Sequence, residues 1–184
     1  MSESAFRSFA ESKGFHAQTI SRWLSWPATD RAALAKLALD LKISENHLRD
    51  LMDWGEEIAL RDGIPIGEIF AGKAIDDIAT DPRLGRADKV KRIKERVRRL
   101  RFPRLARTED EILDKIRALK LQPEIRVSVP PGLEGGRLQI EFSVTNQQDL
   151  KRLADKLAAA AETSMTGDIF TLLGGAPIGP RQRS

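Results

Sequence analysis

The sequence predicts an α+β protein: a mainly α-helical N-terminal region with helix-turn-helix-like helices, then a small α-β-β-α unit. Apolar residues recur at helical spacing through the first part of the chain, up to residue 100. Two short alternating segments follow between residues 125 and 144, and a Leu-rich helical pattern comes after them. The chain has 184 residues, of which 41% are hydrophobic, so it can form one packed domain or two small ones.

The N-terminal helices are predicted from their apolar periodicity and their capping residues. Thr29 or Asp30 is the expected N-cap of the second helix. Ser44 is the expected N-cap of the third helix, and Ile43 before it can pack on Leu48 as a hydrophobic staple. The helices expected before the basic segment cover residues 18–26, 29–41, 45–61, 65–70 and 73–79.

The stretch RADKVKRIKERVRRLRFPRL, residues 86–105, contains ten Lys or Arg residues and two acidic ones. A helix is expected from about residue 87 to residue 101, and Pro103 is expected to end it. The buried apolar stripe of this helix is predicted to contain Val90, Ile93, Val97 and Leu100.

Positive charge is concentrated in this part of the chain. Residues 83–107 contain twelve basic and two acidic residues, whereas the rest of the chain contains 19 basic and 25 acidic residues. Like charges repel along a helix, so this excess indicates a polyanionic partner. DNA is favoured over a membrane surface because the apolar stripe lacks Trp and Phe. The cations expected to contact DNA are Lys89, Lys91, Arg92, Arg96, Arg98, Arg99, Arg101 and Arg104.

Two alternatives to DNA contact remain open for this helix. One is ion pairing with acidic residues elsewhere in the chain, and the other is a membrane surface. For DNA contact, the cations expected to project outward are Lys91, Arg92, Arg98, Arg99 and Arg101. The candidate acids for internal pairing are Glu56, Glu57, Asp76 and Asp77.

Residues 31–54 are a helix-turn-helix candidate. In its second helix, Asn46 and Arg49 have side chains suited to adenine and guanine edges. Asp50 and Asp53 on the same helix would face DNA phosphates unfavourably. This region therefore has two interpretations. It either reads bases in a DNA groove, or it is a plain helical bundle or a partner-binding surface.

The last third of the sequence has a different pattern. Thr108 is expected to open a helix to about residue 121 through a capping box. Strands are expected at residues 125–129 and 138–144, joined by the turn PPGLEGG. Asn146 is the expected cap of a helix over residues 147–162. The tail from residue 163 is expected to be flexible, apart from a candidate docking segment at residues 169–173.

A two-stranded hairpin is marginal in water, so the sequence favours a homodimer in which two hairpins pair. The expected domains are a helical region (1–82), a basic connector (83–107), the dimerisation unit (108–162) and the tail (163–184). The residues expected to dimerise are Ile125, Val127, Leu138, Ile140, Phe142, Leu150, Leu153 and Leu157.

Several functional classes are not expected. The chain has no Cys, and His16 and His47 lack the spacing of metal ligands, so neither a metal nor another cofactor is expected. No catalytic constellation or phosphate loop is recognised, so no enzyme activity is expected. No signal peptide or apolar membrane span is recognised, which predicts a cytoplasmic, nucleoid-associated protein.

The C-terminal segments RFPRLARTEDEILDKIRALKL, IRVSV, GGRLQIEFSV and NQQDLKRLADKLAAA together resemble the dimerisation domain of ParB-type chromosome-partition proteins. The resemblance covers roughly residues 100–162 and is one of pattern and order. Residues 29–70 resemble the helix-turn-helix region of that family more loosely. Nothing matches the family's glycine-glutamate-arginine-arginine box, so neither the N-terminal nucleotide-binding domain nor its CTP-dependent clamp is expected.

The resemblance implies a homodimeric DNA-binding protein of the partition type, with a partition ATPase as a candidate protein partner. Two other functions stay open. One is a non-enzymatic adaptor with a helical partner-binding surface, and the other is a DNA-binding transcriptional regulator.

Overall fold

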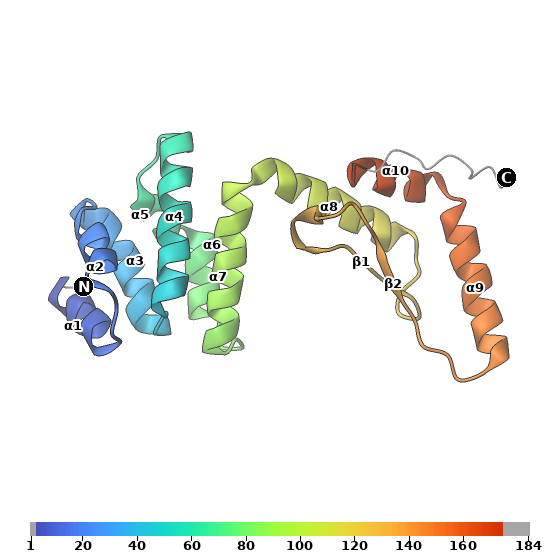
Figure 1. Ribbon diagram of the computed structural model, residues 1–184, viewed down its shortest axis with the longest axis horizontal. Helices are drawn as coiled ribbons and strands as arrows, with labels where there is room; N and C mark the ends of the chain where they lie inside the picture. The colour runs from blue at the N-terminus through green and yellow to red at the C-terminus, as the bar shows by residue number, and fades with distance from the viewer. Residues whose placement is uncertain (1–2, 175–184) are drawn as a thin grey trace. The chain divides into compact units, whose positions relative to one another are not determined.

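The computed structural model describes residues 3–174 and divides the chain into two compact units, residues 1–103 and residues 104–184 (Figure 1). The described part is mainly helical and carries one two-stranded antiparallel sheet. The predicted α+β class, with helices first and a small β unit later, is therefore confirmed.

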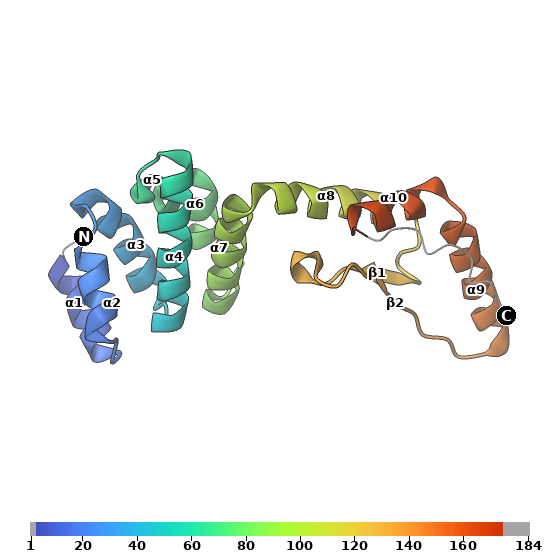
Figure 2. The ribbon, with the colours of Figure 1, turned by 45° about the horizontal axis from the view of Figure 1, so that its top comes forward.

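The first unit consists of helices only. Its longest helices, α4 and α7, lie side by side in both views, with α6 against α7 (Figures 1 and 2). The helices are α1 (Glu3–Ser12), α2 (Ala17–Leu24), α3 (Ala28–Leu41), α4 (Glu45–Asp62), α5 (Ile66–Ala71), α6 (Lys73–Thr80) and α7 (Arg86–Arg101).

The core of the first unit includes the apolar stripe of the basic helix α7. Val90, Ile93 and Val97 are buried there among the apolar side chains of the other helices. At the N-terminal end, the rings of Phe6 and Trp23 pack with their centroids 4.0 Å apart. Helix α7 therefore belongs to the helical unit, because its stripe is needed to complete that core. The expected separate connector at residues 83–107 is divided, and residues 104–107 lie in the second unit.

Near the turn between α3 and α4, the predicted hydrophobic staple agrees with the structure better than the predicted N-caps do. Ile43 and Leu48 are both buried, as the staple requires. Ser44 stands at the N-cap position of α4, although its side chain makes no capping hydrogen bond. The expected cap at Asp30 is wrong, because α3 begins at Ala28. The buried Asp30 carboxylate instead accepts a hydrogen bond of 2.7 Å from the backbone N–H of Gly67, which ties α3 to α5.

The second unit contains α8 (Pro103–Ala118), β1 (Arg126–Ser128), β2 (Gln139–Glu141), α9 (Gln147–Ala161) and α10 (Ser164–Leu172). Helix α8 begins five residues before the predicted cap at Thr108. Pro103 was expected only to end the preceding helix, but a proline is also well suited to the first position of the next one. Thr108 is therefore inside the helix, where its hydroxyl donates to the carbonyl of Arg104 at 3.2 Å.

The hairpin forms as predicted, with shorter strands. Val127 of β1 stands opposite Ile140 of β2, flanked by the pairs Arg126–Glu141 and Ser128–Gln139. The connecting loop contains a single 3₁₀ turn, Pro131–Leu133. Three paired residues on each side form only a small sheet, which depends on the helices packed around it.

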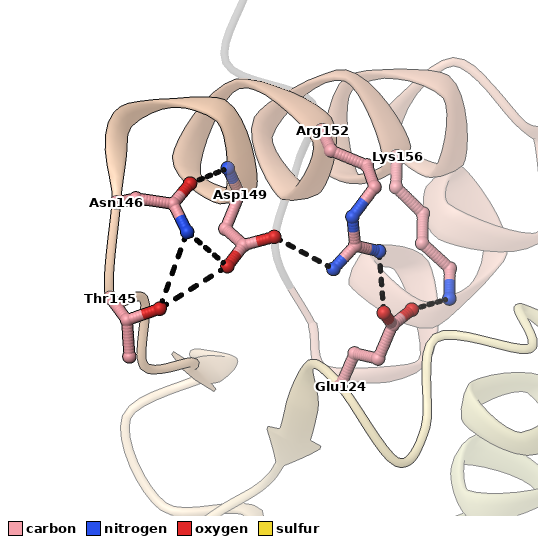
Figure 3. A network of polar contacts seen from close by, with 6 residues as sticks. All are labelled: Glu124, Thr145, Asn146, Asp149, Arg152 and Lys156. Atoms are coloured by element: carbon pink, nitrogen blue, oxygen red, sulfur yellow. Dashed lines mark hydrogen bonds and ion pairs between the residues drawn. The ribbon is translucent and has the colours of Figure 1, made fainter.

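Helix α9 has the predicted cap and is tied to the segment before β1 (Figure 3). The Asn146 side chain accepts a hydrogen bond of 2.8 Å from the Asp149 backbone N–H. Arg152 and Lys156, one turn apart on α9, both donate to the carboxylate of Glu124. Hydrogen bonds from Lys156 and then Arg152 lower the pKa of Glu124, so the carboxylate stays charged and holds α9 in place.

The expectation of a flexible tail from residue 163 is wrong for its first part. Thr163 caps α10 by accepting from the Thr166 backbone N–H, and Ile169 and Leu173 are buried in the core of the second unit. The expected docking segment is therefore part of the fold, while residues 175–184 lie outside the described residues. None of the helices between residues 3 and 174 has both the length and the apolar content of a membrane span.

Candidate nucleic-acid interface

Helix α7 presents cations on both sides of its buried stripe, and the side nearer α4 is internally paired. The Lys94 ammonium lies 2.6 Å from the Asp50 carboxylate and 3.2 Å from Nδ1 of His47. The same ammonium lies 5.4 Å from the ring centroid of Trp54. These contacts join the middle of α7 to α4, so Lys94 has a structural role.

The C-terminal end of α7 is held against α4 in the same way. The Arg101 guanidinium donates to both carboxylate oxygens of Glu57. In return, Arg61 of α4 donates to the backbone carbonyls of Leu100 and Arg101 at 2.9 and 2.6 Å. Carbonyls at a helix C-terminus lack partners within the helix, so Arg61 caps α7.

Two of the five cations that were expected to project outward, Arg98 and Arg101, are therefore held by the protein. Arg101 is paired with Glu57, and its side chain is 27% exposed. Arg98 donates to Glu95 on its own helix at 2.8 Å, and that hydrogen bond lowers the pKa of Glu95. Internal pairing thus accounts for part of the basic segment, and Glu57 was one of its expected acids.

The acidic residues of α4, expected to repel phosphate, each have a basic partner. Arg22 of α2 lies 2.6 Å from Asp53 and 2.6 Å from Glu56. Burial raises the pKa of Glu56, but hydrogen bonds from Arg22 and Trp26 outweigh that effect and keep it below its usual value. Three cations, Arg22, Lys94 and Arg101, thus face four acids of α4, so most of that negative charge is compensated and the electrostatic objection to DNA contact is weaker.

Five other cations of α7 are not used in this way. Within residues 3–174, no ion pair is formed by Arg86, Lys89, Lys91, Arg92 or Arg96; we call these the open cations. Asp81, just before the helix, has a pKa of about 2 chiefly because Arg83 donates to it, with a smaller contribution from the charge of Arg92. The positive charge of α7 therefore exceeds what the fold compensates.

Asn46 and Arg49, the two candidate base-reading residues, are both exposed in the first turns of α4. Glu45 beside them is held by the Thr19 hydroxyl and by the His16 backbone and ring. Burial raises the pKa of Glu45, but these hydrogen bonds together lower it. Three residues, including Lys42 in the left-handed conformation at φ 48°, connect α3 to α4, as in a helix-turn-helix.

A groove of about 1000 Å³ runs between the α3–α4 turn and α7. We call it the α3–α7 groove. Its apolar lining comes from Leu41, Ile43, Trp54, Ala87 and Val90. The cations along it are Lys42, Arg86, Lys91, Lys94 and Arg98.

The predicted dimerisation residues divide into three groups in the second unit, according to their exposure. Ile125, Val127 and Leu153 are buried in the core of a single chain, so they are not available on its surface as expected. Their apolar side chains pack with α8 and α10 because the hairpin needs a cover within its own unit. Ile140 and Leu150 are 42% and 46% exposed. The half-buried members of the set are Leu138, Phe142 and Leu157.

The basic residues of the second unit include both paired and exposed side chains. Arg152 is paired with Glu124 and Asp149, as described above. Arg104 and Arg107 in the first turns of α8 are exposed. Among the described residues, no group of three His, Cys, Asp or Glu side chains is placed to hold a metal ion.

Sequence reasoning identified Glu57 as a possible internal partner, but it missed the pair between Lys94 and Asp50 and the α3–α7 groove. A signal for the pairs was present, because Asp50, Asp53 and Glu57 recur at helical spacing and form an acidic stripe that complements a basic helix. The groove had no such signal, since its lining comes from three separate segments. Comparison of the chain with protein-family models, curated proteins and solved structures found no match.

Proposed function

We propose that this protein binds DNA as a homodimer, in the manner of the ParB-type partition proteins that its C-terminal sequence resembles. The observation that supports the proposal best is the set of open cations on α7. Lys94 and Arg101 are explained by the packing of α7 against α4, whereas the open cations form no ion pair among the described residues. Their mutual repulsion costs stability, and a polyanion would relieve it.

The proposed contact is with the phosphate backbone. Helix α7 has 16 residues, so it is about 24 Å long and can span several phosphates. Lysine and arginine side chains release counterions when they contact DNA, which makes the affinity strongly dependent on salt. The exposed Asn46 and Arg49 would add base contacts at the start of α4, where the nearby Asp50 is already paired with Lys94.

The proposed dimer forms through the second unit. A sheet of two short strands leaves free edges, and Ile140 on β2 is exposed beside one of them. Leu150 and Val144 are exposed apolar residues in the same unit. A second copy would cover these side chains and could extend the sheet to four strands. In this proposal a partition ATPase is the expected partner and the nucleoid the expected location, and no catalytic role is assigned.

An adaptor function is the second candidate, and the α4–α7 ion pairs favour it because they give part of the basic helix a purely structural role. The two functions are separated by fluorescence anisotropy with a labelled DNA duplex of random sequence. A DNA-binding protein should lose about 10³–10⁵ in affinity between 50 and 200 mM salt if each dimer contacts 6–10 phosphates. No measurable binding at 50 mM salt would favour the adaptor.

A further inference from the structure

The α3–α7 groove has a surface that DNA phosphates do not explain. Its floor is apolar, with Ile43, Trp54 and Val90 contributing to it. Phosphate groups need hydrogen-bond donors and cations, and apolar side chains offer neither. A ligand that fills this groove needs an apolar surface and negative charge together.

The cations along the groove exceed its acids. Lys42, Arg86 and Lys91 line it without an ion pair among the described residues, while Glu95 is the one acidic residue of the lining and is engaged by Arg98. Buried apolar contact would supply affinity, and the charged rim would select ligands with acidic edges. The groove is thus complementary to an acidic, amphipathic partner.

The shape of the groove favours a helical ligand. Arg86, Val90, Lys94 and Arg98 line it at intervals of four residues along α7. These positions span 12 residues of helix, or about 18 Å, which is three turns. A partner helix of similar length would present an apolar stripe at i, i+3, i+4 and i+7 to such a floor. We propose that the α3–α7 groove binds an acidic amphipathic helix of a partner protein, at a site that shares Arg86 and Lys91 with the proposed DNA contact.

The probe for this test is a fluorescein-labelled synthetic 16-residue peptide, with Leu at positions i, i+3, i+4, i+7 and i+8 and Glu at the flanking positions. One control peptide has the same composition in an order that breaks the stripe, and another has Gln in place of Glu. We expect the probe to bind the full chain about tenfold more tightly than either control. Equal binding of the Gln peptide, or no binding of the probe, would overturn the proposal.

Two variants of the protein separate the groove from the DNA surface. Ala87 is exposed on the groove, so Ala87→Phe should fill the groove without changing charge. It should weaken peptide binding by about tenfold and leave duplex DNA binding unchanged. Lys89 is one of the open cations but does not line the groove, so Lys89→Glu should weaken DNA binding and leave peptide binding unchanged.

Unfolding followed by tryptophan fluorescence would confirm that both variants keep the first unit folded. Peptide binding that survives Ala87→Phe would show that the peptide binds elsewhere. Loss of DNA binding in Ala87→Phe would place DNA in the groove. Displacement of the labelled peptide by laurate, at a concentration lower than that of unlabelled peptide needed for the same effect, would assign the groove to a small amphiphile. Each of these three results would overturn the proposal.

Discussion

Replacing Lys94 with Met tests whether the paired cations of α7 stabilise the first unit. The change removes the ammonium that contacts Asp50 and His47 and keeps an apolar stem of similar length. The side chains of Lys94 and Asp50 are 21% and 44% exposed, so we assign the ion pair the upper part of the range for surface pairs, about 0.5–1 kcal/mol. The cation over the Trp54 ring adds about 0.5–1 kcal/mol. Lys94→Met should therefore destabilise the first unit by about 1–2 kcal/mol.

The assay is urea unfolding of the full chain followed by tryptophan fluorescence. All three tryptophans, Trp23, Trp26 and Trp54, are in the first unit, so the signal reports that unit alone. A double-mutant cycle with Asp50→Asn isolates the ion pair, and its coupling energy should be about 0.5–1 kcal/mol. A coupling energy near zero, with Lys94→Met as stable as the parent protein, would refute a structural role for Lys94.

Three further predictions concern the core, the dimer and pH. Ile93→Ala should destabilise the first unit by about 2–5 kcal/mol, because Ile93 is fully buried, and unchanged tryptophan-monitored unfolding would contradict the packing of α7. Ile140→Asp should convert a dimer into a folded monomer in light scattering, since the exposed side chain would face the second copy; an unchanged dimer mass would place the interface elsewhere. The pKa values of Glu56 and Glu95 are lowered in the folded protein, so below about pH 4.5 the unfolded chain binds more protons than the folded chain. The stability that these two groups contribute should therefore be constant above that pH and fall as the pH decreases through it. A first unit that is equally stable at pH 3 and pH 6 would rule out these ion pairs.

Most helices of the first unit were predictable from their apolar periodicity, whereas α1 was not among the expected helices. Ile43 and Leu48 are both buried, as the expected staple requires, and Asn146 in the second unit forms the expected cap. Predictions failed where one residue type serves two roles. Pro103 can end a helix or begin one, and the fold uses it to begin α8. Asp30 has the side chain of a cap, but the fold uses it to hold the Gly67 backbone of α5.

Long-range charge pairing was beyond the reach of sequence patterns. The sequence identified Glu57 as an acid available to the basic helix, but the choice of Arg101 as its partner depends on how α4 and α7 pack. Asp76 and Asp77 were equally plausible acids, and they pair instead with Lys36 and Lys73. The sequence shows which side chains are charged, whereas the tertiary fold decides which of them form ion pairs with one another.

The salt dependence of DNA binding by a triple variant tests the proposed DNA contact most directly. Lys89→Ala, Lys91→Ala and Arg96→Ala together remove three open cations and keep helix propensity high. A matched control removes three exposed cations elsewhere in the first unit, with Arg7, Lys13 and Lys73 changed to Ala. The triple variant should bind all duplexes more weakly. The slope of the logarithm of the binding constant against the logarithm of the salt concentration should become shallower by roughly 0.9 for each phosphate that the protein no longer neutralises. The control should keep the slope of the parent protein. An unchanged affinity and slope in the triple variant would contradict DNA contact through α7.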